Sequence, residues 1–525
     1  MSTESPRPAG AIPDGAAREP VAPLLLNPLD DVALAVSAIP AQATVTLADG
    51  RRLTAVEAIP AGHKMAVRPI LRSSVVRKYG QVIGHASADI ACGSLVHVHN
   101  LGSSVSQHAQ TAGADYRPVD PMDPPATFDG YVRANGRVGT RNYVGVISSV
   151  NCSATVTRAI ASAFTGAAMA RHPGVDGVVA ITHGTGCGMG GAGEGIELLR
   201  STLRGYADHP NFAAVLVVGL GCEVNQVAPL IADLDRHEPG RVMAMTIQDA
   251  GGTREAIARG TQIVADMLTM ASRARRTPVS ACHLVVGLQC GGSDGYSGIT
   301  ANPALGMAVD LVVRHGGTAI LSETPEIYGA EHLLTARAST PQVAERLMDR
   351  IRWWEHYTAK NGGDMNNNPS PGNKAGGITT ILEKSLGAVA KGGGSGLMDV
   401  VEYAQPVRTA GLVFMDTPGY DPVSATGQVA GGANLICFTT GRGSTYGCKP
   451  TPSLKLATNT PMFERMRLDM DFNAGRILDG TLGLAEAGEQ IFRLMLATAS
   501  GASTCSEEHG LGDNEFVPWQ LGAVM

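Results

Sequence analysis

The chain has 525 residues, more than one ordinary hydrophobic core can hold, so we expect about two to four domains. Its 41 basic and 47 acidic residues give a net charge of −6, and no basic patch offers the electrostatic footprint that nucleic-acid binding requires. Only 4% of the residues are aromatic while 65 are glycine, a composition typical of close-packed α/β layers with many loops at strand ends.

Cysteine usage and the N-terminus bear on the cellular compartment. The nine cysteines are an odd number and none stands in a Cys-x-x-Cys pair, so a reducing compartment fits better than secretion. Residues 1–28 are polar and rich in Pro and Ala, lack the pattern of a signal peptide, and are predicted to be a disordered tail. No apolar run reaches the roughly 20 residues that span a bilayer. The sequence therefore predicts a cytoplasmic protein that contacts no membrane.

Short runs of β-type residues alternate with turns in residues 29–105, which predicts a small all-β domain. Its last predicted strand runs from Leu95 to Val98. If the strand continues, His97 and His99 point to one face, a geometry that can bind a metal or a carboxylate. The alternative is two solvent-facing histidines on an edge strand, because two histidines alone do not make a metal site. Further polar groups of this domain are His63, Lys64 and Asn100.

Residues 106–125 are rich in Pro, Asp and Ala and are predicted to be a linker. Strands and helices then alternate in residues 126–277, a pattern that predicts an α/β domain with a parallel sheet. The predicted strands are Tyr143–Val150, Val178–Thr182, Ala214–Leu220 and Val242–Ile247, and an amphipathic helix runs from Thr253 to Arg276.

Three cysteines recur in phase with these strands. The same interval, 35 residues or about one βα unit, separates Cys152 from Cys187 and Cys187 from Cys222, so each follows a strand end. In a parallel sheet such ends share one edge. The thiols could bind a soft metal, could only line a site for a hard metal, or could simply pack in the core. His183 and Glu223 stand in the same loops.

The loop from Gly186 to Gly191 also fits the G-x-G-x-x-G pattern of dinucleotide-binding proteins. However, it follows the second strand of its domain, and the acidic partner of that pattern would be Asp208 or Glu223, both at awkward positions. A nicotinamide-dependent oxidoreductase is therefore an alternative to the function that we favour below.

The third region, residues 278–525, opens with an apolar run, Leu284–Leu288, and a polar, glycine-rich loop. A helical pattern follows, for which Asn302 is a suitable N-cap. The glycines allow the backbone to come close to a ligand, although a tight connection is the alternative. Three side chains of this loop go beyond what a turn requires, namely Cys290, Ser293 and Asp294.

Later strand ends carry charged residues. Val413–Met415 leads into Asp416, and Leu435–Thr440 leads into Arg442; either side chain could bind a metal or a carboxylate, or form a structural salt bridge. Earlier in the chain, the run from Asn366 to Gly377, which contains Lys374, is too rich in Asn, Pro and Gly for a regular element. It is predicted to be a flexible surface loop or a lid that faces the substrate.

Several of these motifs together resemble one enzyme family. They are Gly-Arg-Val-Gly-Thr-Arg-Asn at 136–142, Val-Asn-Cys-Ser at 150–153, His-Gly-Thr-Gly-Cys-Gly at 183–188, Gly-Leu-Gly-Cys-Glu at 219–223 and the loop after Leu288. In this order they resemble the altronate and galactarate dehydratase family, from about Asp30 to Met525. The segments 444–450 and 513–519 look more like the altronate branch.

The resemblance implies a multidomain α/β fold with a small N-terminal β-clip domain of the SAF type, a Rossmann-like middle domain and a C-terminal α/β domain. It also implies a divalent metal, Fe(II) or Mn(II) with Mg(II) as the alternative, and dehydration of a six-carbon sugar acid. We expect D-altronate to become 2-dehydro-3-deoxy-D-gluconate. A homodimer or higher homo-oligomer is expected.

This chemistry assigns candidate roles. A base must remove the C2 proton, an acid must protonate the departing C3 hydroxyl, and an electrophile must stabilise the enediolate. The predicted catalytic residues are His63, Lys64, His97 and His99, with His97 and His99 also as metal ligands. The predicted substrate-binding residues are Asn100, Arg137, Arg141, Asn142, Cys152, His183, Cys187, Cys222, Glu223, Cys290, Ser293, Asp294, Asn302, Lys374, Asp416 and Arg442.

Other functions stay open at this point. Within the family, the reaction could be galactarate dehydration or sulfolactate desulfonation. Outside it, the chain could be the nicotinamide-dependent oxidoreductase considered above, or a protein that binds a sugar acid without turning it over.

Overall fold

A computed structural model describes residues 22–103, 111–232, 234 and 239–522. The chain divides into two compact units, residues 1–81 with 85–101 and residues 82–84 with 102–525. Most of the predicted disordered tail and the start of the predicted linker lie outside the described residues. Leu24, however, pairs with Leu34 through a backbone hydrogen bond of 2.8 Å, so the tail prediction is wrong for the last residues before 29. None of the described helices combines the length and apolarity that crossing a membrane requires.

The N-terminal unit is all-β, as predicted. Its strands form one sheet in the order β1-β4-β7, a hairpin of β2 and β3, and a third sheet in the order β5-β6-β8. Their bounds are β1 Val32–Leu34, β2 Thr44–Thr46, β3 Arg52–Thr54, β4 Lys64–Ala66, β5 Val75–Lys78, β6 Gln81–Ala86, β7 Leu95–Val96 and β8 Leu101–Gly102.

The same structural feature occurs at four buried isoleucines of this unit. Ile39 pairs with Ile59, and Ile70 with Ile90, as isolated antiparallel bridges. Three positions after each isoleucine the backbone turns through a positive φ of 63° to 86°, at Gln42, Gly62, Ser73 and Gly93. This left-handed conformation reverses the chain at once, and glycine adopts it without steric cost. Four similar corners thus shape this unit, and Ile39 and Ile59 lie in its hydrophobic core.

The predicted strand through Val98 is wrong, because β7 ends at Val96. Asn100 ends it: its side-chain oxygen accepts from the His97 N–H at 2.9 Å, and its amide donates to the Leu95 carbonyl at 2.9 Å. His97 and His99 therefore lie in a turn rather than on one strand face. The ring of half-buried His97 lies 5.1 Å from that of His63, whereas His99 is exposed.

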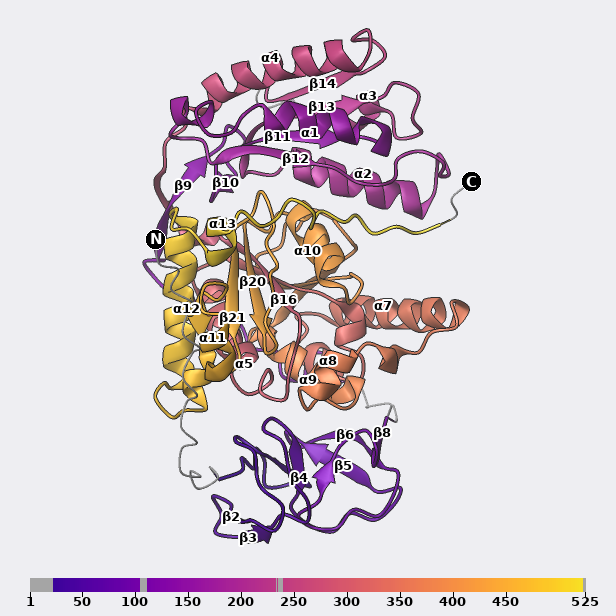
Figure 1. Cartoon of the computed structure of the whole chain (residues 1–525), viewed down its shortest axis with the longest axis vertical. Coiled ribbons are helices and arrows are strands. Elements are labelled where there is room, and N and C mark those ends of the chain that lie inside the picture. The colour runs from indigo at the N-terminus through magenta and orange to yellow at the C-terminus, as the bar shows by residue number, and fades with distance from the viewer. Residues whose placement is uncertain (1–21, 104–110, 233, 235–238, 523–525) are drawn as a thin grey trace, which may run out of the picture. The chain divides into compact units, whose positions relative to one another are not determined.

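The second unit contains two parallel sheets (Figure 1). The middle sheet has the order β12-β11-β13-β14, which is the flavodoxin-like rather than the Rossmann order of doubly wound sheets. Helices α1 (Ala154–Ser162) and α4 (Thr253–Ala271) cover one face, and α2 (Glu194–Ala207) and α3 (Val227–Ile231) cover the other. The strand bounds are β11 Tyr143–Ser148, β12 Gly177–Ile181, β13 Phe212–Gly219 and β14 Val242–Thr246.

The C-terminal sheet has seven parallel strands in the order β18-β19-β17-β16-β20-β21-β22. Helices α5 (Ala301–Arg314) and α12 (Leu484–Ala499) cover one face, and α10 (Asp421–Ala430) lies on the other, against α2. The strand bounds are β16 Val285–Cys290, β17 Thr318–Leu321, β18 Leu397–Val401, β19 Gly411–Met415, β20 Leu435–Thr440, β21 Ser453–Ala457 and β22 Phe472–Asn473. The α/β multidomain class is thus confirmed.

Strand order locates the ligand-binding edge of this sheet. From β16 the chain moves to β17 and β19 on one side, and later returns to β20 on the other side. Such a reversal is where open α/β sheets bind ligands, outside the carboxyl ends of the strands. Cys290, the last residue of β16, pairs here with Thr439 of β20.

Arg137, Arg141 and Asn142, predicted to hold the substrate, instead serve the fold. They precede Tyr143, where β11 begins, so they lie at the edge opposite the strand-end loops. Arg141 donates to both carboxylate oxygens of Glu507 at 2.6 and 2.7 Å, and Arg137 pairs with Asp208 at 2.8 Å. Asn142 donates to the carbonyls of Gly174 and Ala271. Protein groups therefore bond these side chains in the fold, and their contact with substrate stays a prediction.

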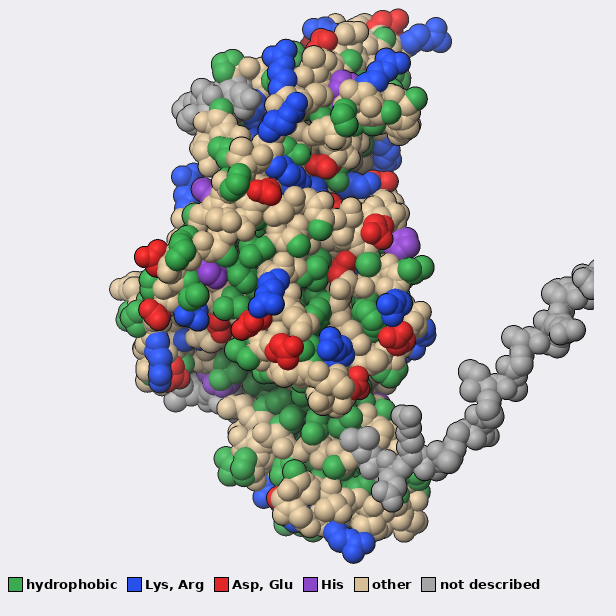
Figure 2. Space-filling view, turned by 90° about the vertical axis from the view of Figure 1, so that its left-hand side faces the viewer, with side chains coloured by type: hydrophobic (Ala, Val, Ile, Leu, Met, Phe, Trp, Pro, Cys, Tyr) green, Lys and Arg blue, Asp and Glu red, His purple; other side chains and the backbone are tan. Residues whose placement is uncertain are grey.

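On the face drawn in Figure 2, Lys and Arg side chains alternate with Asp and Glu. Among the described residues this face therefore presents no extended field of one sign.

We expect Arg141→Met to destabilise the protein without a specific effect on substrate binding. The change removes five hydrogen bonds and leaves Glu507 without its buried partner, which costs about 3 kcal/mol or more. Urea titration should show a lower unfolding midpoint. Arg493→Met is the matched control, since Arg493 is a largely exposed partner of Glu489 and should leave the midpoint unchanged. A wild-type midpoint with a raised KM in Arg141→Met would instead restore its role in binding.

Candidate active site

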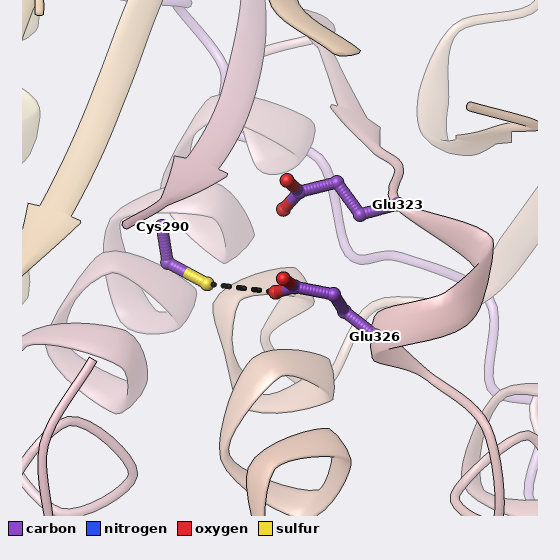
Figure 3. A group of neighbouring side chains, drawn as sticks. All are labelled: Cys290, Glu323 and Glu326. Atoms are coloured by element: carbon purple, nitrogen blue, oxygen red, sulfur yellow. Dashed lines mark hydrogen bonds between the residues drawn. The ribbon is translucent and has the colours of Figure 1, made fainter. Parts of the chain in front are cut away.

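Side chains from distant strand ends converge in the C-terminal sheet. Cys290 ends β16, while Glu323 and Glu326 lie just after β17. Their ligand atoms all lie within 4.8 Å of one another, and all three residues are buried. Figure 3 shows the thiol and both carboxyl groups pointing toward a common point. Such a donor set has the spacing to hold a divalent metal ion.

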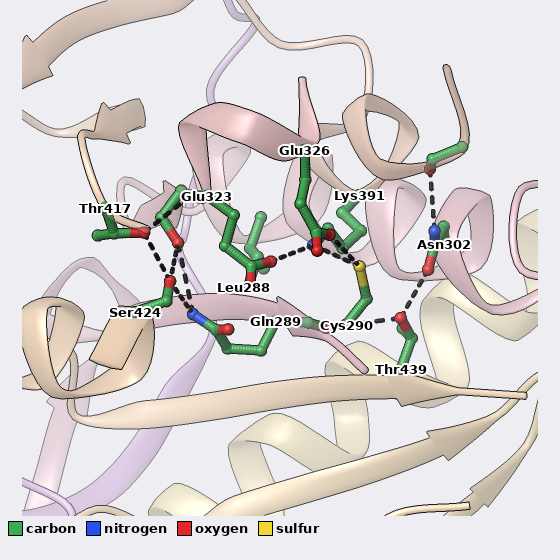
Figure 4. Close-up of polar contacts among 12 residues, drawn as sticks. Leu288, Gln289, Cys290, Asn302, Glu323, Glu326, Lys391, Thr417, Ser424 and Thr439 are labelled. Carbon is green, nitrogen blue, oxygen red and sulfur yellow. Dashed lines mark hydrogen bonds and ion pairs between the residues drawn. The ribbon is translucent and has the colours of Figure 1, made fainter. Parts of the chain in front are cut away.

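Two buried lysines face this group. Lys391, which is 0% exposed, places its Nζ 3.0 Å from Cys290 Sγ and 3.4 Å from a Glu323 oxygen (Figure 4). Lys384 donates to Glu326 Oε1 and to Asn368 Oδ1, each at 2.7 Å. Burial alone would favour neutral amines, but the adjacent thiol and carboxyl groups raise the pKa of both lysines above their usual range. Both therefore carry charge.

The three carboxyl groups differ in pKa. Burial raises the pKa of Glu323 well above its usual value, which favours its protonated form. Burial acts on Glu326 as well, but the charges of Lys384 and Lys391 outweigh it and lower the pKa of that carboxylate. For Asp421, burial and then the charge of Glu326 raise the pKa to about 7. The site therefore combines two ammonium groups, one carboxylate, one carboxyl group whose pKa is raised and one that titrates near neutrality.

Asp421 is the accessible member of this set. It begins α10 and is half-buried, unlike the enclosed Glu323. A Cβ at Gly291 would lie 2.4 Å from its Oδ2 and 2.6 Å from the Phe438 ring, so only glycine lets the loop after β16 pass this carboxyl group.

A second buried network fixes the strand ends beneath the site (Figure 4). Gln289 donates to Ser424 at 2.8 Å and to the Gln428 side chain at 2.9 Å, and Gln428 donates to Ser322 at 2.8 Å. Glu323 follows with a φ of 70°, and its N–H donates to Thr417 Oγ1. A left-handed glutamate costs free energy, and this network holds it in place.

Asn302 takes a different role from the one predicted. The N-cap position of α5 is Thr300, and Asn302 lies inside the first turn. Its amide donates to the Gly387 carbonyl at 2.9 Å and its oxygen accepts from Thr439 Oγ1 at 2.6 Å. Asn302 therefore joins α5 to β20 and to the helix that carries Lys384, α9 (Ile381–Val389).

Asp294 organises its own loop. Its carboxylate accepts from the backbone of Tyr296 and Ser297 and from the side chains of Thr458 and Asn459, at 3.0 to 3.1 Å. Protein groups thus bond the carboxylate already, and its contact with substrate hydroxyls stays a prediction. Ser293 is buried, and its carbonyl accepts from Asn373.

The run from Asn366 to Gly377 forms a wall of the site. Contrary to the prediction of no regular element, Pro371–Ala375 is a short helix, α8, closed by a capping box between Ser370 and Asn373. Asn368 accepts from Lys384, which ties this wall to the buried charges, and Lys374 is half-buried on α8. These bonds tie the segment to the rest of the protein, and its contact with a substrate stays a prediction.

Asp416 and Arg442 fall outside the cluster. Asp416 accepts from Thr324 Oγ1 at 2.5 Å and from Trp354 Nε1 at 2.8 Å, so the structural alternative holds for it. Arg442 is exposed beside Gly292.

The predicted residues of the middle sheet lie on another edge. Cys152, Cys187 and Cys222 are exposed there, whereas Cys290 belongs to the C-terminal sheet. Glu223 accepts from Ser149 Oγ and from the Gly221 N–H, which fixes its loop. Burial lowers the pKa of His183 to about 4, and this neutral ring bonds the Ser148 carbonyl and the Thr185 N–H. His183 and Glu223 therefore stabilise their loops, and their contact with substrate stays a prediction.

The sequence reasoning missed the central residues Glu323, Glu326, Lys384, Lys391 and Asp421. One signal was present for the lysines: both stand in otherwise apolar or glycine-rich helical segments, where a charge is expensive to bury unless it is paired. The predicted roles of His63, Lys64, Asn100, His97 and His99 belong to the N-terminal unit and stay predictions.

Comparison with known proteins gives a consistent picture. Three family models match: the altronate/galactarate dehydratase SAF domain at residues 22–104, the second domain of D-galactarate dehydratase/altronate hydrolase at 130–272, and the C-terminal domain of D-galactarate/altronate dehydratase at 281–524.

Individual relatives point to the same family as the three family models. An altronate dehydratase of Escherichia coli (strain K12) is 36% identical over 92% of this chain and 96% of its own length. An altronate dehydratase of Bacillus subtilis (strain 168) is 35% identical over 84% and 88%, and a galactarate dehydratase (L-threo-forming) of E. coli is 36% identical over 92% and 94%. The chain belongs to the D-galactarate/altronate dehydratase family.

Proposed function

We propose that this chain is a hydro-lyase that removes water from a hexonic sugar acid, D-altronate, to give 2-dehydro-3-deoxy-D-gluconate. The observation that carries the proposal is the buried cluster around Cys290, in which two ammonium groups adjoin a carboxyl group that titrates near neutrality. Two relatives named altronate dehydratase support this substrate.

Different residues of the cluster have different roles in the proposed dehydration. Asp421 is the general base for the C2 proton, because a pKa of about 7 leaves it ionised in part at neutral pH yet basic enough to accept a proton. Lys384 and Lys391 neutralise the charge that builds up on the substrate carboxylate as the proton leaves. In the metal-free site Glu323, whose pKa burial raises, is the acid that serves the departing C3 hydroxyl, whereas as a metal ligand it would be ionised and would leave that role.

The same cluster fits a divalent metal. Cys290, Glu323 and Glu326 offer three buried donors, and Glu323 Oε1 has no hydrogen-bond partner among the described residues. When bound, Fe(II) or Mn(II) would supply a Lewis acid for the substrate carboxylate, with Mg(II) as the alternative. The Lys391 ammonium group contacts Cys290 and Glu323, so a bound metal ion and this ammonium group would both lie next to the same two side chains.

D-Galactarate is the second candidate substrate, because the galactarate dehydratase of E. coli is as similar as the altronate dehydratases are. Incubating the purified, iron-loaded chain with each acid and identifying the product by mass spectrometry separates the two. Turnover of D-altronate to a 2-keto-3-deoxy acid supports the proposal. Turnover of galactarate alone would move the chain to the other branch, and no keto acid from either would refute the function.

The nine cysteines are unpaired, which supports the proposed cytoplasmic location. The homo-oligomer remains a prediction.

Asp421→Asn should lower kcat/KM by about 100-fold or more, the usual contribution of a general base. In the wild type, kcat/KM should rise with pH through about 7, because the base works in its ionised form. Steady-state rates from pH 5 to 9 test both points. Asp266→Asn, the same change at an exposed position on α4, is the control and should leave the profile unchanged. A wild-type rising limb in Asp421→Asn would remove Asp421 from this role.

Loss of the donors should lower metal content. We expect Glu323→Gln and Glu326→Gln each to weaken Fe(II) and Mn(II) binding at least 10-fold, because each removes one of three protein ligands. Equilibrium dialysis with metal analysis measures this directly. Glu355→Gln, an exposed change on α7 (Pro341–Lys360), is the control. Unchanged metal affinity in both site variants would place the ion elsewhere.

A further inference from the structure

The middle sheet exposes three thiols at one edge, and the proposed dehydration uses none of them. Cys152 follows β11, Cys187 follows β12 and Cys222 follows β13, and these strands are neighbours in the sheet. Four of the nine cysteines are exposed, and three of the four are these. Exposed thiols are open to oxidation and metals, so their concentration at one edge requires an explanation other than packing.

The three loops form one framework. The Asn151 N–H donates to the Thr185 carbonyl at 2.9 Å, which joins the loop of Cys152 to that of Cys187. The Asn225 N–H donates to the Gly186 carbonyl at 3.1 Å, which joins the loops of Cys187 and Cys222. Ser149 Oγ donates to Glu223 Oε1 at 2.7 Å and closes the third side. Within two residues of each cysteine, a hydrogen bond therefore joins its loop to the loop of another of the three cysteines.

Glycines hold these loops in a conformation that other residues resist. Gly186, Gly188 and Gly221 have φ values of 101°, 66° and 127°. A Cβ at Gly186 would lie 2.6 Å from the Ser149 carbonyl oxygen, and one at Gly221 would lie 2.4 Å from Gln248 Oε1. The backbone beside Cys187 and Cys222 is thus fixed before any ligand binds, as a preorganised site requires.

Thiolates select soft metals and iron–sulfur clusters. One tetrahedral zinc ion with bonds of about 2.3 Å would need sulfur atoms about 4 Å apart. Across the described residues, these three Sγ atoms do not all come within 4.8 Å of one another. A cluster accepts a wider spacing, because each thiolate binds its own iron. His183 and Glu223, the nearest candidates for a fourth ligand, are bound into the loops.

We propose that Cys152, Cys187 and Cys222 bind a 4Fe–4S cluster through three thiolates, which leaves one iron without a protein ligand and open to an oxygen atom of a small-molecule acid. This site is separate from the group around Cys290, and it stands whether or not the proposed dehydration is correct.

Anaerobic reconstitution of the full chain with iron and sulfide tests the proposal. We expect about four irons and four acid-labile sulfides per chain. Sulfide content distinguishes this site from a mononuclear ion at Cys290, which takes up none. Alkylation mapped by mass spectrometry gives a second readout: the cluster should protect all three thiols, while exposed Cys282 stays reactive.

Serine variants complete the test. Cys152→Ser, Cys187→Ser and Cys222→Ser should each lose most of the bound sulfide, whereas Cys282→Ser and Cys290→Ser should retain it. Because the three thiols are exposed, far-UV circular dichroism should show that these variants stay folded. Absence of sulfide in the wild type, stoichiometric zinc in its place, or equal sulfide binding by the triple serine variant would each overturn the proposal.

Discussion

The candidate site depends on charge neutralisation inside a closed interior. Two ammonium groups and an ionised carboxylate are buried here, and each would cost several kcal/mol if buried alone. Lys384 pairs with Glu326, and Lys391 contacts Cys290 and Glu323. Burial raises the pKa of Cys290 and of Glu323, which favours the neutral forms of these two groups beside the lysines. The two ammonium groups attract the carboxylate of a sugar acid.

Sheet geometry makes this neutralisation possible. Parallel pairing of β16 with β17 and β20 brings Cys290, Glu323 and Thr439 to one edge. The Gln289, Gln428 and Ser424 network locks those strand ends, so the strain of a left-handed Glu323 is carried by the fold. A loosened network would separate the carboxyl groups from the lysines and leave charges unpaired. Catalytic geometry and stability therefore rest on the same hydrogen bonds.

The sequence predicted the strands that end near Cys290 and Thr439, since apolar runs ended by polar residues depend on local pattern. It failed where tertiary contacts decide. The hydrogen bonds of Asn100 end β7 at Val96. His97 and His99 therefore do not lie on a strand, and the prediction that they share one strand face does not apply. Lys391 meets Cys290 across 101 positions of sequence, a convergence that no spacing rule contains. Arg141 was predicted to bind substrate because it stands in a motif of the resemblance, and Asp294 because it stands in a glycine-rich loop, but protein groups bond both side chains.

The two parallel sheets carry different chemical groups at the ends of their strands. At the edge of the middle sheet, the titratable side chains of His183 and Glu223 are hydrogen-bonded to the protein. The three cysteine thiols at this edge are exposed. At the edge of the C-terminal sheet sulfur is buried with a thiol pKa raised to about 12, and what remains free is a carboxyl group near neutrality beside two cations. Elimination of a hydroxyl group requires proton transfer and charge stabilisation together, and the second edge offers groups for both. A ligand held by the thiols would add an electrophile to the chain but no base, so the proposed proton abstraction uses the carboxyl group of the C-terminal sheet.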